Sequence, residues 1–262
     1  MRQTVSVSII TKNEEANLAR TLDSVKWADE LVIVDSGSVD GTLQIARDHG
    51  AKVFTEEWQG YAQQKNYAIA KCMCDWVLSL DADEEVSPEL AEEIQAILAA
   101  NAPYRAYSVP RRNHFLGRWI RHGGYYPDRK LRLFPRGACL FEERTVHETM
   151  RLVSQDVVLD NTSLKGALLH HCYPTIEDYI EHMNCYSSLG GELALSAGKA
   201  SRSLPAFVGN VLVNPAATFV YNFVFRLGFL DGREGLLLHL YHSLYISWKY
   251  AKAWQRGRNR PL

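Results

Sequence analysis

The chain has 262 residues, of which 47% are hydrophobic, which is enough for a sizeable core and excludes global disorder. Its five cysteines are irregularly spaced, which excludes a disulfide framework and a cysteine-based zinc site. The formal net charge of −1 hides an asymmetry, because residues 198–262 carry nine Lys/Arg against two acidic residues. This basic, aromatic end on an acidic body predicts a surface that meets something anionic.

Residues 1–100 alternate between apolar runs and helical patterns. Strands are predicted at VSVSII (5–10), LVIVDS (31–36), AKVFTEE (51–57) and WVLSL (76–80), with helices at 14–28, 41–50, 61–73 and from Pro88, where Ser87 is the expected N-cap. Continuous apolar strands separated by helices are typical of a parallel sheet covered on both faces. Such sheets bind ligands beyond the carboxyl ends of their strands, where this sequence has TKNEE, DSGSVDG and DADEE.

The second half of the chain is less regular. Residues 129–134 alternate and predict a strand, with Leu131 and Leu133 on one face and Lys130 and Arg132 on the other. Thr175 is the expected cap of a helix that runs to residue 195, and two apolar stretches follow at 204–225 and 236–248. No signal peptide is expected before the first strand, and this expectation and the cysteines favour the cytosol.

Asp81 and Asp83 follow a buried strand directly. Residues i and i+2 project to the same side of an extended chain, so the two carboxylates are expected to repel unless they share a cation. A hard divalent ion with room for phosphate oxygens would relieve that repulsion. The alternative is a solvated turn that leads into a helix. A helix–loop–helix calcium site is excluded, because Val86 stands where such a loop needs glycine.

Asp35 ends another predicted strand, and Gly37, Ser38 and Gly41 turn the chain tightly after it. The spacing matches neither a Walker loop nor a dinucleotide fingerprint, so on spacing alone a strand-to-helix turn capped by Asp40 is favoured. Acids at two strand ends of one parallel sheet nevertheless suit a nucleotide held at its base or ribose and at a metal-bound diphosphate.

Four segments together resemble glycosyltransferase family 2, which has the nucleotide-sugar-binding GT-A fold. They are VSIITKNEEANL, VDSGSVDGT, QQKNYAIA and WVLSLDADE, in that order over the first hundred residues. The later segments GGYYPDRKLRLFPRG…VHE, LLHHCY and GFLDGREG resemble a bacterial subgroup, the lipopolysaccharide core β-glucosyltransferases. The resemblance implies a mostly parallel, Rossmann-like α/β sheet flanked by helices over residues 1–172 (donor half 1–100, acceptor half 101–172) and a C-terminal helical extension over 173–262.

The resemblance also implies roles for individual residues. The residues expected to contact the nucleotide-sugar are Thr11, Asn13, Glu14, Asp35, Lys65, Asn66 and Asp81. Asp83 is expected as the more direct ligand of a Mg or Mn ion, with Asp81 beside it. His170, in register with the subgroup's H-x-x-Y element, is an expected further ligand, although a histidine behind an apolar run is often a core residue. Lys65 stands where many members have arginine, which weakens bidentate phosphate binding.

Inverting sugar transfer needs a base on the acceptor side. Glu148 in FEERTVHETM is the predicted base and His147 its orienting partner or substitute; the alternative is a surface turn with a structural His–Glu contact. Asp128 is a rival base or a structural ion pair. The basic stretch 111–136 could hold a phosphorylated acceptor through Asp128, Arg129 and Arg132, or it could be a solvated face. A pI near 6.8 and the lack of a binding motif argue against nucleic acid.

The stretch 204–225 is long enough to cross a bilayer, but it contains prolines and asparagines. Helices lying in the membrane interface are therefore expected, with the basic end on anionic lipid. The alternative is that they cover the core or an oligomer interface.

Together these inferences predict a metal-dependent inverting transferase that moves a hexose, glucose above all, from a UDP-sugar to an anionic lipid-linked saccharide, the lipopolysaccharide inner core, at the cytoplasmic face of the inner membrane. A polyprenyl phosphate or peptide acceptor, a nucleotidyltransferase and a lipid-binding scaffold are the alternatives.

Overall fold

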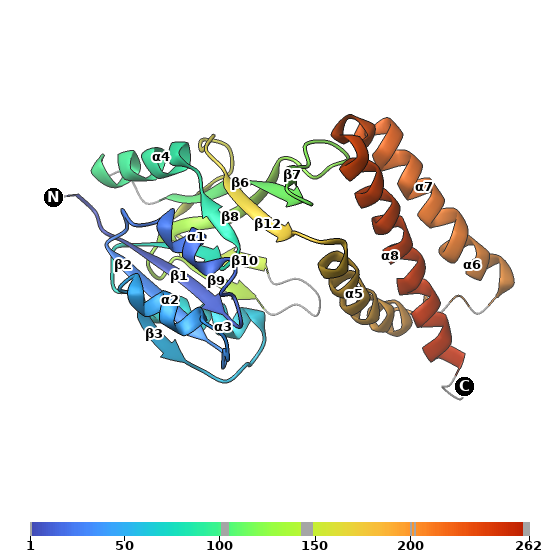
Figure 1. Cartoon of the computed structure of the whole chain (residues 1–262), viewed down its shortest axis with the longest axis horizontal. Coiled ribbons are helices and arrows are strands. Elements are labelled where there is room, and N and C mark those ends of the chain that lie inside the picture. Colours follow the sequence, from blue (N-terminus) through green and yellow to red (C-terminus); the bar gives the residue numbers. More distant parts are fainter. Residues whose placement is uncertain (1, 101–104, 143–148, 200, 202, 259–262) are drawn as a thin grey trace. The chain divides into compact units, whose positions relative to one another are not determined.

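The computed structural model describes residues 2–100, 105–142, 149–199, 201 and 203–258. It divides into two compact units, which are described separately (Figure 1). Unit 1 comprises residues 1–112 and 128–170, and unit 2 comprises residues 113–127 and 171–262.

The central sheet has the strand order β3-β2-β1-β4-β8-β6-β12-β5. Its first four strands are parallel, namely β1 (Val5–Thr11), β2 (Glu30–Asp35), β3 (Lys52–Thr55) and β4 (Trp76–Asp81). The others are β5 (Glu84–Val86), β6 (Arg105–Phe115), β8 (Asp128–Pro135) and β12 (Leu168–Tyr173), with β7 (Arg118–Trp119) and β11 (Val158–Asp160) paired to β6. A separate pair is formed by β9 (Cys139–Glu142) and β10 (Thr149–Leu152). Because β8 runs antiparallel to β4, the sheet is mixed.

Helices cover both faces of the parallel strands and build two cores. The helices of unit 1 are α1 (Leu18–Asp23), α2 (Thr42–Asp48), α3 (Tyr61–Lys71) and α4 (Pro88–Ala99). One core joins side chains of α1, α2 and α4 to alternate residues of β1 and β4, such as Val7 and Leu78. The other joins α3 to residues of opposite parity, including Val32 and Val77. This two-sided burial explains why the strands are continuously apolar.

The observed elements confirm the predicted fold class, a mostly parallel sheet flanked by helices. Ser87 caps α4 as expected, since its side chain accepts a hydrogen bond from Leu90 N at 3.3 Å. The helix expected over 14–28 is shorter and spans Leu18–Asp23, and the backbone N–H groups of Glu14 and Glu15 bond instead to Thr42 at the start of α2 and to Asp40 before it. The strands β5, β6 and β12 were not predicted from the sequence pattern.

Unit 2 is mainly helical. It contains α5 (Ile176–Ser196), then α6 (Leu204–Val208), η1 (Gly209–Val213), α7 (Asn214–Val220) and η2 (Tyr221–Phe225) without a break, then η3 (Gly228–Asp231) and α8 (Gly232–Arg258). Thr175 caps α5 with a capping box that it shares with Asp178. The continuous helix from Leu204 to Phe225 is long and apolar enough to cross a membrane.

The GFLDGREG segment ties residues 113–127 to α8. The carboxylate of Asp231 accepts hydrogen bonds from the backbone N–H groups of Arg121 (3.1 Å) and His122 (2.8 Å) and lies 3.0 Å from His122 Nδ1. Gly123 and Gly228 leave room for the ring of His239, which a Cβ at either position would overlap. These contacts explain why residues 113–127 group with the C-terminal helices in unit 2.

Candidate functional site

Asp35 shapes the loop that follows β2. Its buried carboxylate accepts hydrogen bonds from the backbone N–H groups of Gly37 and Ser38 (both 2.8 Å), from Ser38 Oγ (2.5 Å) and from Thr11 Oγ1 at the end of β1 (3.1 Å). Gly37 has φ +86°, a left-handed conformation that glycine adopts without strain. Asp35 thus joins the ends of two neighbouring parallel strands, and its predicted nucleotide contact stays a prediction.

Asn13 and Glu14 line the same edge of the sheet. Asn13 has φ +56° and accepts a hydrogen bond from the Val39 N–H at 2.9 Å, which fixes the first loop to the second. Burial raises the pKa of Glu14; a hydrogen bond from Asn17 opposes this shift, and the charge of Asp83 adds to it. The loops after β1 and β2 therefore form one hydrogen-bonded rim, as the sequence predicts for the carboxyl ends of parallel strands.

Asp81 lies between two cations at the end of β4. Lys65 Nζ of α3 is 2.7 Å from its Oδ1, and Arg132 Nη2 of β8 is 2.5 Å from its Oδ2. Burial alone would raise the pKa of Asp81, but the charges of Arg132 and Lys65 lower it well below its usual range. Asp81 is therefore a carboxylate at neutral pH, and its charge is already paired within the protein.

Glu84 and Arg111 complete this cluster, and neither was predicted as a site residue. Glu84 is fully buried, although the sequence suggested a solvated side chain, and its Oε1 is 2.7 Å from Arg132 Nη2 and 3.1 Å from Arg111 Nη1. Arg111 in turn donates to Asp128 Oδ2 through Nη2 (2.7 Å) and Nε (3.0 Å). Three carboxylates and three cations thus alternate without interruption.

Asp83 faces His170 rather than this cluster. His170 Nε2 lies 3.3 Å from Asp83 Oδ2, because β12 pairs with β5 at His170 and Glu84. Burial would raise the pKa of Asp83, but the hydrogen bond and charge of His170 lower it. The interaction between these two predicted metal ligands was not foreseen, although both residues were named.

A divalent ion fits this pair when a substrate completes its coordination. Within the part of the chain that the structure describes, no three His, Cys, Asp or Glu side chains form a ready-made metal group. Mg²⁺ sites in nucleotide-using proteins commonly take one or two protein ligands and fill the remaining positions with phosphate oxygens and water. Asp83 and His170 supply one carboxylate and one imidazole for such a site, whereas both oxygens of Asp81 contact cations.

The three residues predicted to hold the acceptor all have partners inside unit 1. Arg129 donates to the backbone carbonyls of Ser108 and Leu164. Asp128 pairs with Arg111 and with Lys130 Nζ at 3.0 Å. Arg132 is buried, so the alternative of a solvated face is wrong for its side chain, and its predicted contact with an acceptor stays a prediction. The side chain is buried because the buried charges of Asp81 and Glu84 require a cation at this position.

Asn66 and the predicted base complete the list of expected site residues. Asn66 Nδ2 donates to the Phe141 carbonyl (2.9 Å) and its Oδ1 accepts from the Phe141 N–H (2.8 Å), so its amide links α3 to β9. Glu148 and His147 lie outside the described residues.

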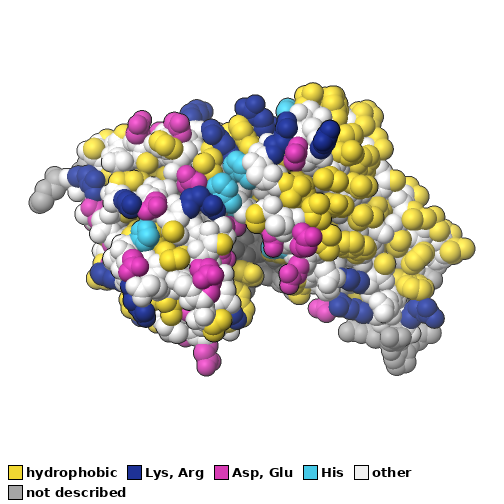
Figure 2. All heavy atoms as spheres, viewed as in Figure 1, with side chains coloured by type: hydrophobic (Ala, Val, Ile, Leu, Met, Phe, Trp, Pro, Cys, Tyr) yellow, Lys and Arg dark blue, Asp and Glu magenta, His cyan; other side chains and the backbone are white. Residues whose placement is uncertain are grey.

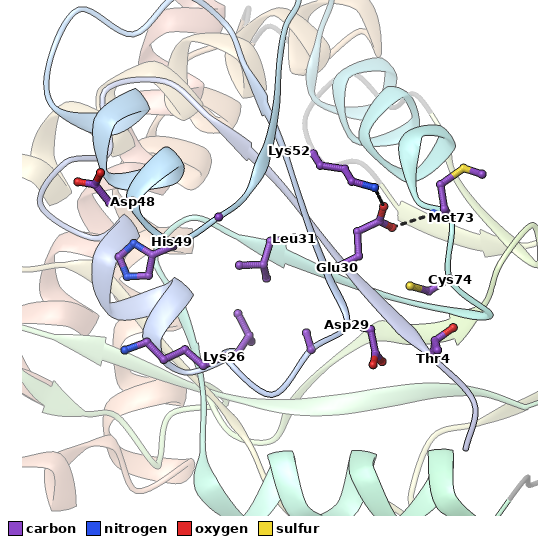
Figure 3. A pocket seen from close by; sticks show the side chains of 13 residues that line it. Thr4, Lys26, Asp29, Glu30, Leu31, Asp48, His49, Lys52, Met73 and Cys74 are labelled. Carbon is purple, nitrogen blue, oxygen red and sulfur yellow. Dashed lines mark hydrogen bonds and ion pairs between the residues drawn. The ribbon is translucent and has the colours of Figure 1, made fainter. Parts of the chain in front are cut away.

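A concavity lies at the opposite edge of the sheet, where the parallel strands begin. It has a volume of about 750 Å³ and is lined by residues such as Thr4, Glu30, Lys52 and Met73 (Figure 3). Glu30 Oε1 is 2.7 Å from Lys52 Nζ, and its Oε2 accepts from the Met73 N–H at 2.8 Å. Since these charges pair with each other and no predicted site residue lies there, the candidate site is the carboxyl-end edge.

The parallel sheet, the loop built on Asp35 and the Asp81–Asp83 pair define a nucleotide-sugar domain of the GT-A type. The model of the family described as glycosyl transferase family 2 matches residues 6–160. The chain therefore belongs to glycosyl transferase family 2, whose members transfer sugars with inversion.

Individual relatives agree with this assignment. An uncharacterized glycosyltransferase of Rickettsia typhi is 36% identical over 212 residues, which cover 74% of this chain and 69% of that protein. The lipopolysaccharide core biosynthesis glycosyltransferase LpsC of Rhizobium meliloti is 31% identical over 264 residues, which cover 96% of this chain and 92% of that protein. A solved structure, glucosyl-3-phosphoglycerate synthase of Mycobacterium tuberculosis with Mn²⁺, UDP and glucosyl-3-phosphoglycerate, matches 40% of this chain and 43% of that one at 25% identity, with a TM-score of 0.34.

Proposed function

We propose that this glycosyltransferase moves a hexose, glucose above all, from a UDP-linked donor to a sugar of the lipopolysaccharide inner core. The observation that carries the proposal is the gathering of Asp35, Asp81, Asp83 and His170 at one edge of the sheet, in a chain that aligns over 96% of its length with a lipopolysaccharide core glycosyltransferase. Carboxylates beside cations at strand ends suit a ligand that carries a ribose and a diphosphate.

Some residues of the site are held in place before a substrate arrives, and others are proposed to bind the donor and a divalent ion. The buried cluster around Glu84 and Arg132 fixes the strand that carries Asp81, so that side chain is held in place before a substrate arrives. Lys65 Nζ lies 2.7 Å from Asp81 Oδ1 at the end of β4, and we assign it to the donor diphosphate. Asp83 and His170 would hold a divalent ion, which when bound would neutralise charge on the departing diphosphate.

The acceptor hydroxyl needs a base, for which we retain Glu148 with His147 beside it. Asp128, the rival, is poorly suited. Burial would raise its pKa, but the charges of Arg111 and Lys130 lower it to about 2, so at neutral pH this carboxylate accepts a proton weakly. Glu148→Gln is expected to abolish transfer while leaving UDP affinity unchanged, and a loss of UDP affinity instead would remove Glu148 from the role of base.

The decisive experiment is a donor screen that measures UDP release with and without purified lipopolysaccharide core acceptor. Release that depends on UDP-glucose, acceptor and Mn²⁺ or Mg²⁺ is expected. Asp83→Asn should abolish it while leaving the fold intact, and Glu85→Gln, a neighbouring acid outside the cluster, is the matched control. Near-normal turnover by Asp83→Asn would end the metal-site proposal. Release with polyprenyl phosphate or a peptide in place of the core acceptor would move the proposal to that acceptor class.

A further inference from the structure

Unit 2 exposes a long apolar helix face. The 22 residues from Leu204 to Phe225 contain no charged side chain, and only 6% of the most apolar window of this helix is buried. Leu212 and Phe225 are 63% and 73% exposed. Figure 2 shows the result as a broad hydrophobic surface over α6, α7 and α8. Apolar surface of this extent usually marks an interaction site rather than ordinary solvent exposure.

The apolar surface continues around the turn and onto α8. Leu227, Phe229 and Leu230, in the turn that joins η2 to α8, are each about half exposed. α8 packs along α7 and exposes three leucines at i, i+4 and i+8, namely Leu236, Leu240 and Leu244. Residues at this spacing lie on one side of a helix. The two helices and their turn therefore form an apolar hairpin, defined here as residues 204–244.

Arginines flank this hairpin at its turn and, beyond residue 244, at the C-terminal end of α8. At the turn, Arg226 and Arg233 are exposed, and Arg118 of β7 lies 3.6 Å from Glu234. At the far end of α8, Arg258 lies over the ring of Trp254, with Arg256 close by in sequence. Arginine at the edge of an apolar surface is the arrangement that suits anionic lipid headgroups around a hydrocarbon interior.

We propose that the apolar hairpin lies in the interface of an anionic bilayer, with its exposed face in the hydrocarbon and its flanking arginines at headgroup phosphates. A spanning arrangement would carry Arg226 and Arg233 across the hydrocarbon, which is strongly unfavourable, whereas an in-plane hairpin keeps both ends at one depth. A second copy of the chain is a poorer occupant, because Arg226 and Arg233 lie at the turn and Arg258 at the far end of α8, so that a parallel or an antiparallel two-fold contact brings arginines of the two copies near one another, and like charges disfavour that contact.

Vesicle flotation of the full chain tests this proposal without donor or acceptor, so its outcome is independent of the proposed sugar transfer. The protein is expected to float with phosphatidylcholine vesicles that contain phosphatidylglycerol and to bind far more weakly to phosphatidylcholine alone. Leu212→Ser combined with Phe225→Ser should lower binding about tenfold or more, given the apolar burial lost. Met73→Ser combined with Val158→Ser, at 67% and 64% exposure in unit 1, is the matched control and should bind as the unaltered chain does.

A charge variant keeps the test decisive if the serine variant does not fold. Arg233→Gln should weaken binding to the anionic vesicles about fivefold, as expected for one basic residue at such a surface, whereas Arg136→Gln in unit 1 should have no effect. The proposal is overturned if the unaltered chain stays unbound, or if the serine variant folds and binds normally. It is also overturned if light scattering shows a dimer that the serine variant loses while no vesicle binding occurs.

Discussion

Arg132→Met should destabilise unit 1 strongly, because Arg132 is the cation that Asp81 and Glu84 share. Its Nη2 is 2.5 Å from one carboxylate and 2.7 Å from the other, and its side chain is 5% exposed. Methionine keeps much of the apolar volume but removes the charge. The carboxylate of Glu84 would then keep only its ion pair with Arg111, and that of Asp81 mainly its ion pair with Lys65. The two buried negative charges would be less well compensated.

The size of the effect follows from these distances. Two unit charges about 4 Å apart attract by about 4 kcal/mol at the effective dielectric of about 20 typical of proteins, before desolvation is counted. Removing one member of a buried pair typically destabilises by about 3–5 kcal/mol, since the remaining charge stays buried. For a unit of this size, each kcal/mol shifts the melting temperature by roughly 2–4 °C, so a fall of roughly 6–20 °C is expected.

A double-mutant cycle distinguishes this electrostatic origin from lost packing. Melting temperature and urea unfolding are measured for Arg132→Met, Glu84→Leu and the combination, with exposed Arg136→Met as control. Each single substitution leaves the remaining charge, Glu84 or Arg132, with a weaker partner. The double mutant removes both charges, so it should lose clearly less stability than the sum of the two single losses. Strict additivity, or an Arg132→Met protein as stable as the Arg136→Met control, would refute the assignment of this cluster as a buried, mutually compensating network.

Three further predictions concern parts of the chain outside this cluster. Asn66→Ala should destabilise by about 1–3 kcal/mol in urea unfolding, because it leaves the backbone groups of β9 without their amide partner. Backbone hydrogen bonds lower the pKa of Asp160 to about 2, below its unfolded value of about 3.9. The stabilisation that the charged Asp160 provides is therefore complete above about pH 4 and is lost as the pH falls toward 2. The melting temperatures of Asp160→Asn and the unaltered chain should converge over that range, and a difference independent of pH would contradict this prediction. A thiol reagent at pH 8 should modify exposed Cys185 but spare Cys72 and Cys139 until the protein is denatured, since burial raises the pKa of both to about 12.

The fold could be predicted from local pattern where burial is two-sided. The strands β1, β2 and β4 are continuously apolar because helices cover both faces, and the sequence shows this directly. The strands β6 and β12 were missed because they carry polar residues, such as Arg111 and His170, whose partners come from distant positions. No local pattern contains a pairing such as His170 with Glu84, which joins segments 86 residues apart in the chain.

The residues of the candidate site likewise fall into those that local sequence pattern reveals and those that depend on distant partners. Asp35, Asp81 and Asp83 could be named from sequence because each follows an apolar strand, and the ends of parallel strands meet at one edge. Arg111, Arg132 and Glu84 could not be assigned, since the burial of a charge depends on a compensating charge elsewhere. A single sequence shows eight Lys/Arg between residues 111 and 136, and it does not show which of them balance the acids of residues 81–85.

The buried cluster also explains why the Asp-x-Asp pair serves two purposes. Asp81, held by Lys65 and Arg132, is tied to the interior, whereas Asp83 faces His170 on the neighbouring strand β12. Because successive polar residues of this segment contact different partners, repulsion between the two carboxylates is relieved on the Asp81 side by the protein's own cations. A divalent ion then needs to satisfy mainly Asp83 and an incoming diphosphate. The two carboxylates are therefore unequal: Asp81 is held by Lys65 and Arg132, whereas Asp83, next to His170, is the one to which we assign the proposed divalent ion.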